Sequence, residues 1–484
     1  MAEGALQVET PPPPEFRLFI GGEWVAGEAV VAIRSPYDGQ VAGLAHRAGA
    51  AHLEQAMHSA AQAFALTSRL PTYQRAAILE GVVAGLKTDR EGLAQLIARE
   101  AGKPLKYARA EVGRAILTFT DAVEEAKRLR GEWLPLDLDA ASEGRQGLVR
   151  RFPVGPVAAI TPFNFPLNLV AHKVAPALAC GSPIVLKPAS QTPLTALRLA
   201  EIVQNAGAPP GSFHVVHCPG AMAETLATDP RMKYLSFTGS GGVGWRLRDL
   251  AGHKKVALEL GGNAGVAVHA DADLDYAAQR CAMGGFAYAG QTCISVQRIF
   301  VHRPVFDAFL EKFIACTRRL KVGDPLDEQT DVGPMISEAE AQRAWAWVEE
   351  AVREGAEMAL GEQPRGTLMP PVILIRTTPA MKVNCQEIFA PVVTVGPYAD
   401  WAEALRLIND SPYGLQAGIF TRDMPAIHQA FETLEVGGLL VNDVPTWRAD
   451  VMPYGGWKES GLGREGVRYA LEGMTERRIM VWKA

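Results

Sequence analysis

The pattern of apolar and polar positions divides the chain into regions of different predicted structure. After a short β-like segment, Phe16 to Val25, the stretch from Ala50 to Arg130 is rich in Ala, Leu, Glu and Arg, and its apolar positions recur at helical spacing. This stretch predicts a series of helices. Residues 132–160 predict an extended hairpin, because two β-like runs, LPLDL and GLVRRFPVGPVAAI, flank the polar segment ASEGRQ.

Short apolar runs then alternate with helical patterns. The runs PIVLK, FHVVH, YLSFTG and VALEL are separated by segments that predict helices, one from Leu194, a short one, and one from Gly242. A second alternation follows from Asp271, with helices predicted near 272–288, 304–319, 337–354 and 400–408 and strands near 297–302, 391–397, 417–420 and 438–441. This rhythm indicates parallel βαβ units and an α/β fold with two doubly wound, open-sheet domains.

Composition and charge exclude several classes of protein. The chain has 484 residues, 48% of them apolar and 21% charged, which is typical of globular domains with buried cores. A net charge of −5 without a long Lys/Arg run disfavours nucleic acid as a partner. The most apolar stretch, Val157 to Ala171, is broken by prolines and Asn164, so no run of roughly 18 apolar residues predicts a membrane span.

The N-terminus and the cysteines indicate a cytoplasmic protein. The start, MAEGALQVETPPPPEF, lacks the basic and apolar regions of a signal peptide, and we expect a frayed, proline-stiffened leader. The six cysteines are far apart and form no C-x-x-C pair, and no histidine cluster has metal-ligand spacing. Structural disulfides and a metal site are therefore not expected.

Two glycine runs match the G-x-G-x-x-G pattern. The run Gly239–Gly244 follows a strand-like segment and opens a helix, a context in which backbone N–H groups can approach a dinucleotide pyrophosphate. The run Gly461–Gly466 matches equally well without a strand before it. Either run alone is as consistent with a tight turn as with a cofactor site.

Three further residues could together perform acyl transfer. Glu259 ends the VALEL strand, where partial desolvation raises a carboxyl pKa toward that of a useful base. Cys293 follows a helix of small residues in GQTC, and Asn164 lies on the proline-rigidified loop TPFNFP, where its amide is a candidate oxyanion donor. Each residue also has a structural interpretation: an inert cysteine, an ion-paired acid and a turn-capping asparagine.

Taken together, the motifs resemble one family over nearly the whole chain. TPFNFP, VLKPAS, FTGS, LELGGN, GQTC, EIFAPV and YGGWKESGLGREG occur in the order and spacing of the NAD(P)-dependent aldehyde dehydrogenase superfamily. The resemblance implies a Rossmann-like cofactor domain, a catalytic domain and a small β oligomerisation element. It assigns residues 1–131 and 149–257 to the NAD(P)-binding domain, 258–456 to the catalytic domain, and 132–148 and 468–484 to the oligomerisation element.

The resemblance also implies a role for each site residue. Cys293 is the nucleophile, Glu259 the general base, Asn164 the oxyanion-hole donor, and Glu465 a member of a proton relay. Lys187 binds the adenine-side ribose, Glu387 binds the nicotinamide ribose, and Phe389 packs near the nicotinamide. The residues expected around the NAD or NADP cofactor are Thr161, Pro162, Phe163, Lys187, Ser190, Gly239, Ser240, Val243, Leu260, Glu387 and Phe389.

The expected chemistry follows from these roles. The Cys293 thiolate attacks the aldehyde carbon, Asn164 and a backbone N–H hold the oxyanion, and loss of hydride to NAD(P) leaves a thioester. Glu259 then activates water for hydrolysis to the carboxylic acid. Two alternatives remain open, a CoA-acylating relative that releases the thioester to CoA, and a non-catalytic structural relative of the fold.

Two positions bear on cofactor and substrate choice. NAD-preferring relatives commonly have Glu three residues after the ribose lysine, whereas this chain has Ser190, so NADP should be tolerated unless Ser190 is merely a helix-start residue. Arg448 stands where relatives with apolar substrates have an aromatic residue, which favours a small polar or anionic aldehyde. Alternatively, Arg448 pairs with Asp450 or with another acid at a subunit contact. Four residues are expected to contact the substrate: Asn168, His172, Thr292 and Arg448.

The resemblance further implies a homo-oligomer. The hairpin at 132–148 and the last strand, near Arg477 to Val481, join sheets across subunits in the family, so that a partner covers an exposed edge. We therefore expect a homodimer or a homotetramer. The branch that the chain resembles contains lactaldehyde, non-phosphorylating glyceraldehyde-3-phosphate and phosphonoacetaldehyde dehydrogenases.

Overall fold

The computed structural model describes residues 12–483, and the leader predicted at the N-terminus lies outside this range up to residue 11. The first of its two large sheets has the strand order β22-β12-β11-β8-β9-β10-β2-β3, in which β12, β11, β8, β9 and β10 are parallel. The strands are β2 (Leu18–Ile20), β3 (Glu23–Val25), β8 (Val157–Ile160), β9 (Ile184–Lys187), β10 (Phe213–Val215), β11 (Tyr234–Thr238), β12 (Lys255–Glu259) and β22 (Gly461–Leu462).

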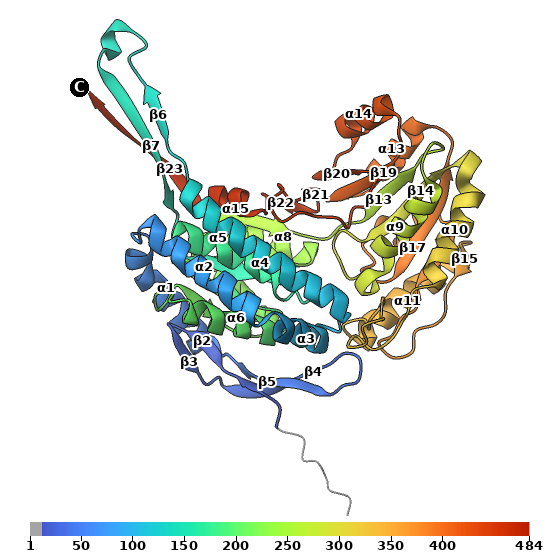
Figure 1. Ribbon diagram of the computed structural model, residues 1–484, viewed down its shortest axis with the longest axis horizontal. Helices are drawn as coiled ribbons and strands as arrows, with labels where there is room; N and C mark the ends of the chain where they lie inside the picture. Colours follow the sequence, from blue (N-terminus) through green and yellow to red (C-terminus); the bar gives the residue numbers. More distant parts are fainter. Residues whose placement is uncertain (1–11, 484) are drawn as a thin grey trace, which may run out of the picture.

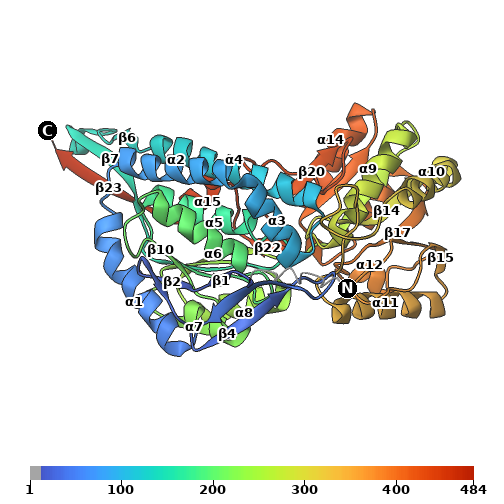
Figure 2. The same cartoon turned by 60° about the horizontal axis from the view of Figure 1, so that its bottom comes forward.

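Helices cover both faces of this sheet. All four residues of β8 are accordingly apolar and buried, with no polar, solvent-facing side. Val157 and Ala159 pack into one core, whereas Ala158 and Ile160 pack into another. Figure 2 shows α2 and α4 on one side of the first unit and α1, α7 and α8 on the other. The helices of this unit are α1 (Ala50–Thr67), α2 (Thr72–Thr88), α3 (Arg90–Ala101), α4 (Leu105–Arg128), α5 (Asn168–Cys180), α6 (Leu194–Asn205), α7 (Ala223–Thr228), α8 (Gly241–Leu250) and α15 (Val467–Gly473).

The second large sheet has the order β15-β16-β17-β14-β13-β19-β20 and is parallel except for β15. Its strands are β13 (Ala264–Val268), β14 (Val296–His302), β15 (Glu357–Leu360), β16 (Val372–Ile375), β17 (Val392–Tyr398), β19 (Gln416–Phe420) and β20 (Gly438–Val441). Helices α9 (Leu274–Phe286), α10 (Phe306–Arg318) and α11 (Glu338–Arg353) pack on one face, and α13 (Trp401–Asn409) and α14 (Met424–Thr433) pack on the other.

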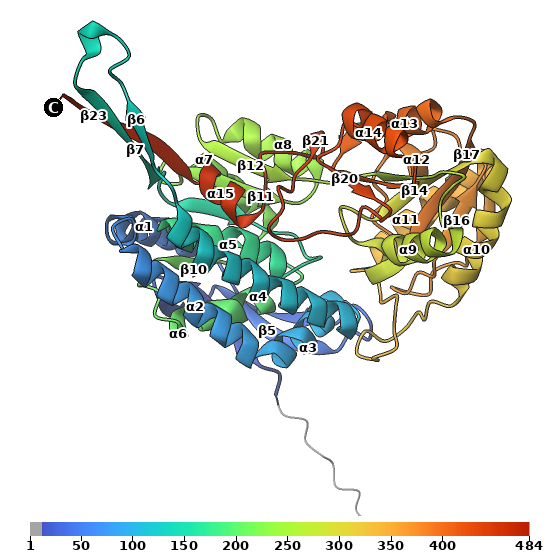
Figure 3. The same ribbon diagram turned by 45° about the horizontal axis from the view of Figure 1, so that its top comes forward.

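A third, antiparallel sheet forms an arm that projects from the body (Figure 1). It consists of β6 (Glu132–Pro135), β7 (Arg145–Pro153) and β23 (Thr475–Lys483), and β23 pairs with β7 along its whole length. After β20 the chain crosses back between the two units (Figure 3) and adds β22 to the edge of the first sheet beside β12. The last residues therefore connect the second unit, the first sheet and the arm.

The α/β class, the two open sheets and the predicted helices over Ala50 to Arg130 are confirmed. The hairpin is present as β6 and β7, but it ends at Pro153, and Val157–Ile160, which was expected to belong to it, is strand β8 of the first sheet. Three further expectations need correction. The central strand β13 was not expected, because its five residues AGVAV are small and form only a short apolar run. The first sheet continues to Glu259, beyond the boundary expected at 257, and Gly461–Leu462 is an edge strand although no strand was expected at that glycine run.

Smaller elements were not expected either. The chain forms a three-stranded sheet of β1 (Glu15–Phe16), β5 (Val41–Arg47) and β4 (Ala29–Arg34), and helix α8 begins at Gly241. Over residues 12–483, none of the helices is both apolar and long enough to cross a bilayer. In the same range, no three His, Cys, Asp or Glu side chains are grouped so as to hold a metal ion, and all six cysteines are free thiols.

Candidate active site

The residues predicted for catalysis come from both sheets. Asn164 lies in the loop after β8, and Glu259 is the last residue of β12. Cys293 lies three residues before β14 of the second sheet. Glu465 directly precedes Gly466, the residue that caps the N-terminus of α15. The backbone of Glu465 forms an antiparallel β-bridge with that of Tyr454. The crossing segment at the end of the chain therefore contributes to a site between the two sheets.

A strained turn presents Cys293. Tyr288, Ala289 and Gly290 have φ values of 52°, 53° and 66°, so two residues other than glycine are left-handed, which costs free energy at each position. Buried Gln291 holds the turn: its side chain donates to the carbonyl of Pro334 (3.2 Å) and accepts from the N–H of Ile336 (2.8 Å). The fixed turn positions the thiol.

The two glycines of LELGGN permit close packing of the motifs around them. A Cβ on Gly262 would lie 2.3 Å from the carbonyl oxygen of Cys293. A Cβ on Gly261 would lie 2.3 Å from a carboxylate oxygen of Glu387, and the N–H of Gly262 donates to Glu387 at 2.9 Å. Because real Cβ atoms do not approach so closely, only glycine permits this contact between LGGN, GQTC and EIFAPV.

Asn164 and Tyr454 approach the cysteine directly. The Asn164 amide donates to the backbone carbonyl of Gln291 (3.0 Å), two residues from Cys293, and its oxygen has no protein partner in the described range. The Cys293 sulfur lies 3.1 Å from the hydroxyl of Tyr454. Burial raises the pKa of the Cys293 thiol to about 12, against a smaller lowering by the Tyr454 hydrogen bond. The protein environment around Cys293 therefore favours the thiol over the thiolate.

Glu259 is a buried carboxyl group with no hydrogen-bond partner on either oxygen among the described residues. Burial, and then repulsion from Glu465, raise the pKa of Glu259 well above its ordinary value. Gly455 of the YGG motif leaves room for it, since a Cβ there would lie 2.9 Å from Glu259 Oε1. An unpartnered, desolvated carboxyl group of this kind is suited to act as a general base.

Glu465 has the opposite environment. Burial opposes its ionisation, but the nearby cations of Lys173 and Arg448 outweigh burial and lower the pKa of Glu465. Lys173 Nζ lies 3.5 Å from Glu465 Oε1, and Arg448 Nη2 donates to Oε2 at 3.1 Å. The pKa values of the two carboxyl groups are therefore shifted in opposite directions, an arrangement typical of acid–base centres.

The sequence left two interpretations of Arg448 open, a contact with substrate and an ion pair with an acid, and the structure is consistent with both. It lines the cavity in front of Cys293, and it also pairs with acids, Glu465 at 3.1 Å and Asp450 at 3.8 Å. Its guanidinium carbon lies 3.6 Å from the centre of the Tyr454 ring. The side chain is 4% exposed, so packing and ion pairs fix its orientation at the cavity wall.

Asp450 organises the wall beneath Arg448. It accepts two hydrogen bonds from Arg114 (2.6 and 3.0 Å) and one from Asn168 (3.2 Å), and it lies 2.8 Å from His172 Nε2. Burial opposes ionisation of Asp450, but hydrogen bonds from His172 and Arg114 hold its pKa well below its usual range. Burial and the nearby Arg448 cation lower the pKa of His172.

The four residues expected to contact substrate thus separate into two groups. Thr292, Asn168 and Arg448 line a cavity of about 330 Å³ together with Cys293. The His172 side chain is fully buried behind the wall and does not line this cavity. Its contacts with Asp450 and Arg448 make it a support for the wall.

The residues expected to bind cofactor gather at the carboxyl ends of the first sheet. Gly239 follows β11, Ser240 is the N-cap of α8, and Val243 on its first turn is 46% exposed. Lys187 ends β9, and among residues 12–483 its ammonium group makes a single hydrogen bond, to the carbonyl of Pro188 (3.2 Å). An exposed helix N-terminus and an underused cation fit the pyrophosphate and ribose of a dinucleotide.

The nicotinamide side is equally well defined. Phe163 and Phe389 meet edge to face at 6.0 Å between ring centroids, which joins TPFNFP to EIFAPV. Phe389 itself has a positive φ of 51°. Burial raises the pKa of Glu387 to about 7, against the opposing hydrogen bond from Gly262. Thr161 and Pro162 directly precede Phe163 in the chain. Ser190 lies three residues after Lys187 and is exposed, and Leu260 follows Glu259 and is buried.

Sequence reasoning missed several residues of the site. Tyr454 was contained in the YGG motif but was given no role. Lys173 and Lys103 lie on or beside helices of ordinary composition, and only tertiary structure brings them to the site. Arg114 and Arg280 also line the cavity, from α4 and α9, and gave no local signal.

The fold and the arrangement of these motifs are those of a pyridine-nucleotide-dependent oxidoreductase. The family model described as "Aldehyde dehydrogenase family" matches residues 24–480. The chain belongs to this family and is an NAD(P)-dependent enzyme that oxidises aldehydes.

Individual relatives agree with this assignment. The 3-sulfolactaldehyde dehydrogenase of Priestia megaterium is 44% identical over 468 residues, which is 96% of this chain and 98% of the relative. The crystal structure of aldehyde dehydrogenase 21 from Physcomitrella patens, in complex with the reaction product succinate, matches with a TM-score of 0.96 and 43% identity over 98% of this chain and 99% of that one. Glyceraldehyde-3-phosphate dehydrogenase from Methanocaldococcus jannaschii, complexed with NADP, matches with a TM-score of 0.90 and 39% identity over 94% and 99%.

Proposed function

We propose that this enzyme oxidises a small aldehyde that carries a carboxylate, sulfonate or phosphate group. The observation that carries the proposal is the wall of the cavity in front of Cys293, which contains three arginines, Arg114, Arg280 and Arg448. Arg114 and Arg280 are each paired with one aspartate, Asp450 and Asp443, and keep 28% and 22% of their side chains exposed. Guanidinium groups held at a cavity wall are typical anion-binding groups.

The relatives support an anionic substrate. Their names specify 3-sulfolactaldehyde, sulfoacetaldehyde and aspartate semialdehyde, and the Physcomitrella structure contains succinate. Each of these molecules carries an acidic group a few atoms from the reacting carbon. Lactaldehyde, the substrate named for the methanogen relatives, is uncharged and small. The arginines of the cavity wall favour the anionic aldehydes over neutral lactaldehyde as substrates of this enzyme.

In the proposed mechanism, the Cys293 thiol releases its proton to solvent, and its sulfur then forms a bond to the aldehyde carbon. The carbonyl oxygen becomes an oxyanion, which the backbone N–H of Cys293 stabilises together with the second N–H of the Asn164 amide, the one that does not donate to Gln291. The substrate carbon would lose a hydride to NAD(P)⁺ held at Lys187, Ser240 and Glu387, and an acyl group would remain on Cys293. Glu259 then takes a proton from water, the new oxygen–carbon bond forms, the carbon–sulfur bond breaks, and the acid is released.

Lys173 and Glu465 complete this cycle in the proposal. Lys173 donates to Ser236 (3.0 Å) and contacts Glu465, and Arg448 connects Glu465 to the cavity wall. Because Glu259 makes no hydrogen bond to this chain of buried polar groups within residues 12–483, a relay of its proton along the chain requires a bridging water molecule. Tyr454 holds the sulfur in place through its hydroxyl group.

The experiment is a rate assay with matched aldehydes and both cofactors. Succinic semialdehyde and 3-sulfolactaldehyde are compared with butyraldehyde and lactaldehyde, each with NAD⁺ and with NADP⁺. We expect kcat/KM for the anionic aldehydes to exceed that for neutral aldehydes of similar length by at least about tenfold. Equal values for both groups would contradict the proposed substrate class. Product analysis with and without CoA separates hydrolysis from acyl transfer to CoA.

We also propose that the arm makes the enzyme a homodimer or a homotetramer. The arm exposes Trp133, Ile479, Met480 and Val481, whose side chains are 47–58% exposed, and β6 is an edge strand. An exposed apolar edge of this kind is usually covered by a partner. Light scattering should show an oligomer, and a stable monomer at working concentrations would contradict this proposal.

A further inference from the structure

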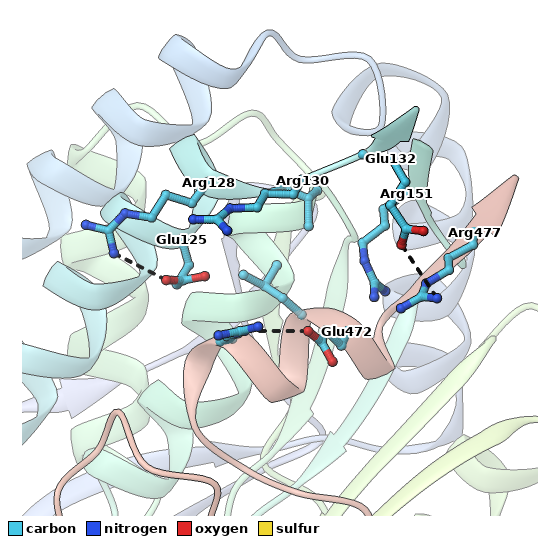
Figure 4. A pocket seen from close by; sticks show the side chains of 11 residues that line it. Glu125, Arg128, Arg130, Glu132, Arg151, Glu472 and Arg477 are labelled. Atoms are coloured by element: carbon cyan, nitrogen blue, oxygen red, sulfur yellow. Dashed lines mark hydrogen bonds and ion pairs between the residues drawn. The ribbon is translucent and has the colours of Figure 1, made fainter. Parts of the chain in front are cut away.

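A hollow of about 390 Å³ lies at the root of the arm, away from the cavity in front of Cys293. It lies where the end of α4 meets α15 and strands β6, β7 and β23. Figure 4 shows the side chains that surround it. Its lining residues are Glu125, Arg128, Leu129, Arg130, Gly131, Glu132, Arg151, Arg468, Leu471, Glu472 and Arg477.

The charges around this hollow do not balance. Five arginines face three glutamates, and the ion pairs that connect them are long. Arg128 contacts Glu125 at 3.5 Å, Arg468 contacts Glu472 at 3.6 Å, and Arg477 contacts Glu132 at 3.7 Å. Arg128 also pairs at 3.0 Å with Glu124, which does not line the hollow. Arg130 and Arg151 form no ion pair with any residue in the range 12–483, so the lining carries an excess of positive charge.

The strand register places two of these arginines directly opposite each other. In the β7–β23 pair, Arg151 is the register partner of Arg477. Like charges in this position destabilise an antiparallel pair. Arg151 donates to the hydroxyl of Thr475 (3.3 Å), and Arg477 makes the long contact with Glu132. Within residues 12–483 neither guanidinium group has another hydrogen bond or ion pair. Figure 4 shows both guanidinium groups on the side of the hollow.

A second arginine pair in the same two strands shows how such repulsion can be relieved. Arg150 is the register partner of Arg478, and alternation places this pair on the other face of the sheet. Both guanidinium groups lie against the ring of Phe152, at 5.5 and 4.3 Å from its centre. Cation–π contacts therefore stabilise this pair, whereas Arg151 and Arg477 have no aromatic partner in the described part of the chain.

We propose that the hollow binds a compact anion with two or more phosphate groups. An anion of this kind would neutralise the opposed arginines, and guanidinium groups donate paired hydrogen bonds to phosphate oxygens. The volume of the hollow admits a small phosphorylated molecule and excludes a polymer from its interior. The proposal concerns a site separate from catalysis and does not depend on the substrate class proposed above.

The hollow also has a short structural connection to the active site. Arg468 and Glu472 on α15 line it, and the same helix begins two residues after Glu465. A ligand that bridges α15 to β7 and β23 would therefore restrain the segment that carries Glu465. Binding is the primary claim, and a change in turnover is its expected secondary effect.

The test uses the full chain with saturating NADP⁺, so that the cofactor's own pyrophosphate site is filled. Inorganic pyrophosphate is the probe, inorganic phosphate the single-group comparison, and KCl the control for ionic strength. Calorimetry and thermal unfolding should show pyrophosphate binding and a rise in Tm that KCl does not reproduce. The double variant Arg151→Gln/Arg477→Gln should weaken this binding at least about tenfold, because two charged donors are lost.

The matched control is Arg150→Gln/Arg478→Gln, which removes the same charge from the same two strands on the opposite face. It should bind pyrophosphate like the wild type. Arg130→Gln, on an exposed side chain without an ion pair, tests the same hollow should the first double variant fail to fold. Two outcomes would overturn the proposal: equal weakening of pyrophosphate binding in both double variants, or no pyrophosphate binding by the wild type. A change in oligomeric state with unchanged pyrophosphate binding would assign the arginines to a subunit contact instead.

Discussion

The two large sheets contribute to the active site from opposite ends. In the first sheet, functional residues follow the carboxyl ends of strands: Asn164 after β8, Lys187 at the end of β9, Ser240 after β11 and Glu259 at the end of β12. In the second sheet they precede the amino ends: Cys293 lies before β14 and Phe389 before β17. The carboxyl ends of the second sheet hold a packed aromatic cluster instead, in which His269 and His302 stack at 4.8 Å.

The two sheets therefore position their active-site residues in different ways, one with helix N-termini and the other with close backbone packing. The carboxyl ends of a parallel sheet provide helix N-termini that suit phosphates and ribose, in agreement with the general rule for open α/β sheets. The amino ends provide no such dipole, and there the chain uses close backbone packing, through Gly261, Gly262 and the left-handed turn at Tyr288 and Ala289. We therefore expect the first sheet to govern cofactor binding and hydrolysis, and the second sheet to govern formation of the covalent adduct.

The largest effect is expected at the second sheet. Cys293→Ala should lower kcat by about 10⁴-fold or more, because no covalent adduct can form, while NAD(P) binding remains. The measurement is steady-state turnover together with cofactor binding by fluorescence. Cys281→Ala is the control, because that thiol lies in the core and should affect stability without affecting kcat. Turnover above a tenth of the wild-type value in Cys293→Ala would contradict the assignment of Cys293 as the nucleophile.

A smaller loss is expected from the base at the first sheet. Glu259→Gln should lower steady-state turnover by about 10²- to 10⁴-fold, since water is no longer activated. If the adduct forms independently of this residue, rapid-quench kinetics should show one burst of NAD(P)H per active site, followed by slow release. A burst that is slowed as well would show that Glu259 also activates the thiol. Unchanged turnover would contradict both roles.

The raised pKa of Glu259 predicts a pH dependence with a definite sign. Burial and Glu465 favour the neutral form, and only the carboxylate can act as base, so hydrolysis should slow as pH falls through this raised pKa. The measurement is kcat against pH under conditions in which hydrolysis limits the rate. Glu259→Gln should lack this acidic limb. An identical limb in the variant would assign the titration to another group.

Arg448 tests whether the cavity wall selects the substrate. Arg448→Ala should cost roughly 2 to 5 kcal/mol of transition-state binding for an anionic aldehyde, by analogy with the loss of one partner of a desolvated charge pair. A neutral aldehyde should lose less, and only through the contact of Arg448 with Glu465. Arg448→Lys should recover part of the loss, because ammonium cannot reproduce the paired donors of guanidinium. An equal loss for both aldehydes would make the residue purely structural.

The sequence predicted the first sheet's contribution better than the second's. Gly239–Ser240, Lys187 and Glu259 follow apolar runs with recognisable β patterns, so their placement at strand ends could be inferred. In the second sheet, β13 was missed because AGVAV is short and small, and with it the reason for the two preceding glycines. Small residues that serve close approach give no hydrophobic periodicity, so only their tertiary neighbours explain them.

The arginines that line the cavity in front of Cys293 show a second limit of prediction from the sequence. Arg114 and Arg280 lie on helices whose patterns predict only an amphipathic surface, and they reach the cavity from separate parts of the chain. Arg448 was a candidate because it departs from a family pattern, yet its contacts with Glu465 and Asp450 could not be distinguished from a substrate role by sequence. Charge networks of this kind depend on distances that local sequence does not encode.

The smallest effect is expected at the cofactor edge of the first sheet. Ser190 is exposed three residues after Lys187, and no carboxylate stands there to repel a 2′-phosphate. Ser190→Glu should lower kcat/KM with NADP⁺ by about tenfold relative to NAD⁺, because a like charge at an exposed site costs about one to two kcal/mol. Ser190→Gln has nearly the same size without the charge and should leave the ratio of the two efficiencies close to that of the wild type. The ratio is measured with one aldehyde at a fixed ionic strength, since salt screens this repulsion. A ratio that shifts equally in both variants would trace the effect to side-chain volume, and an unchanged ratio in Ser190→Glu would show that cofactor preference is decided elsewhere along this edge.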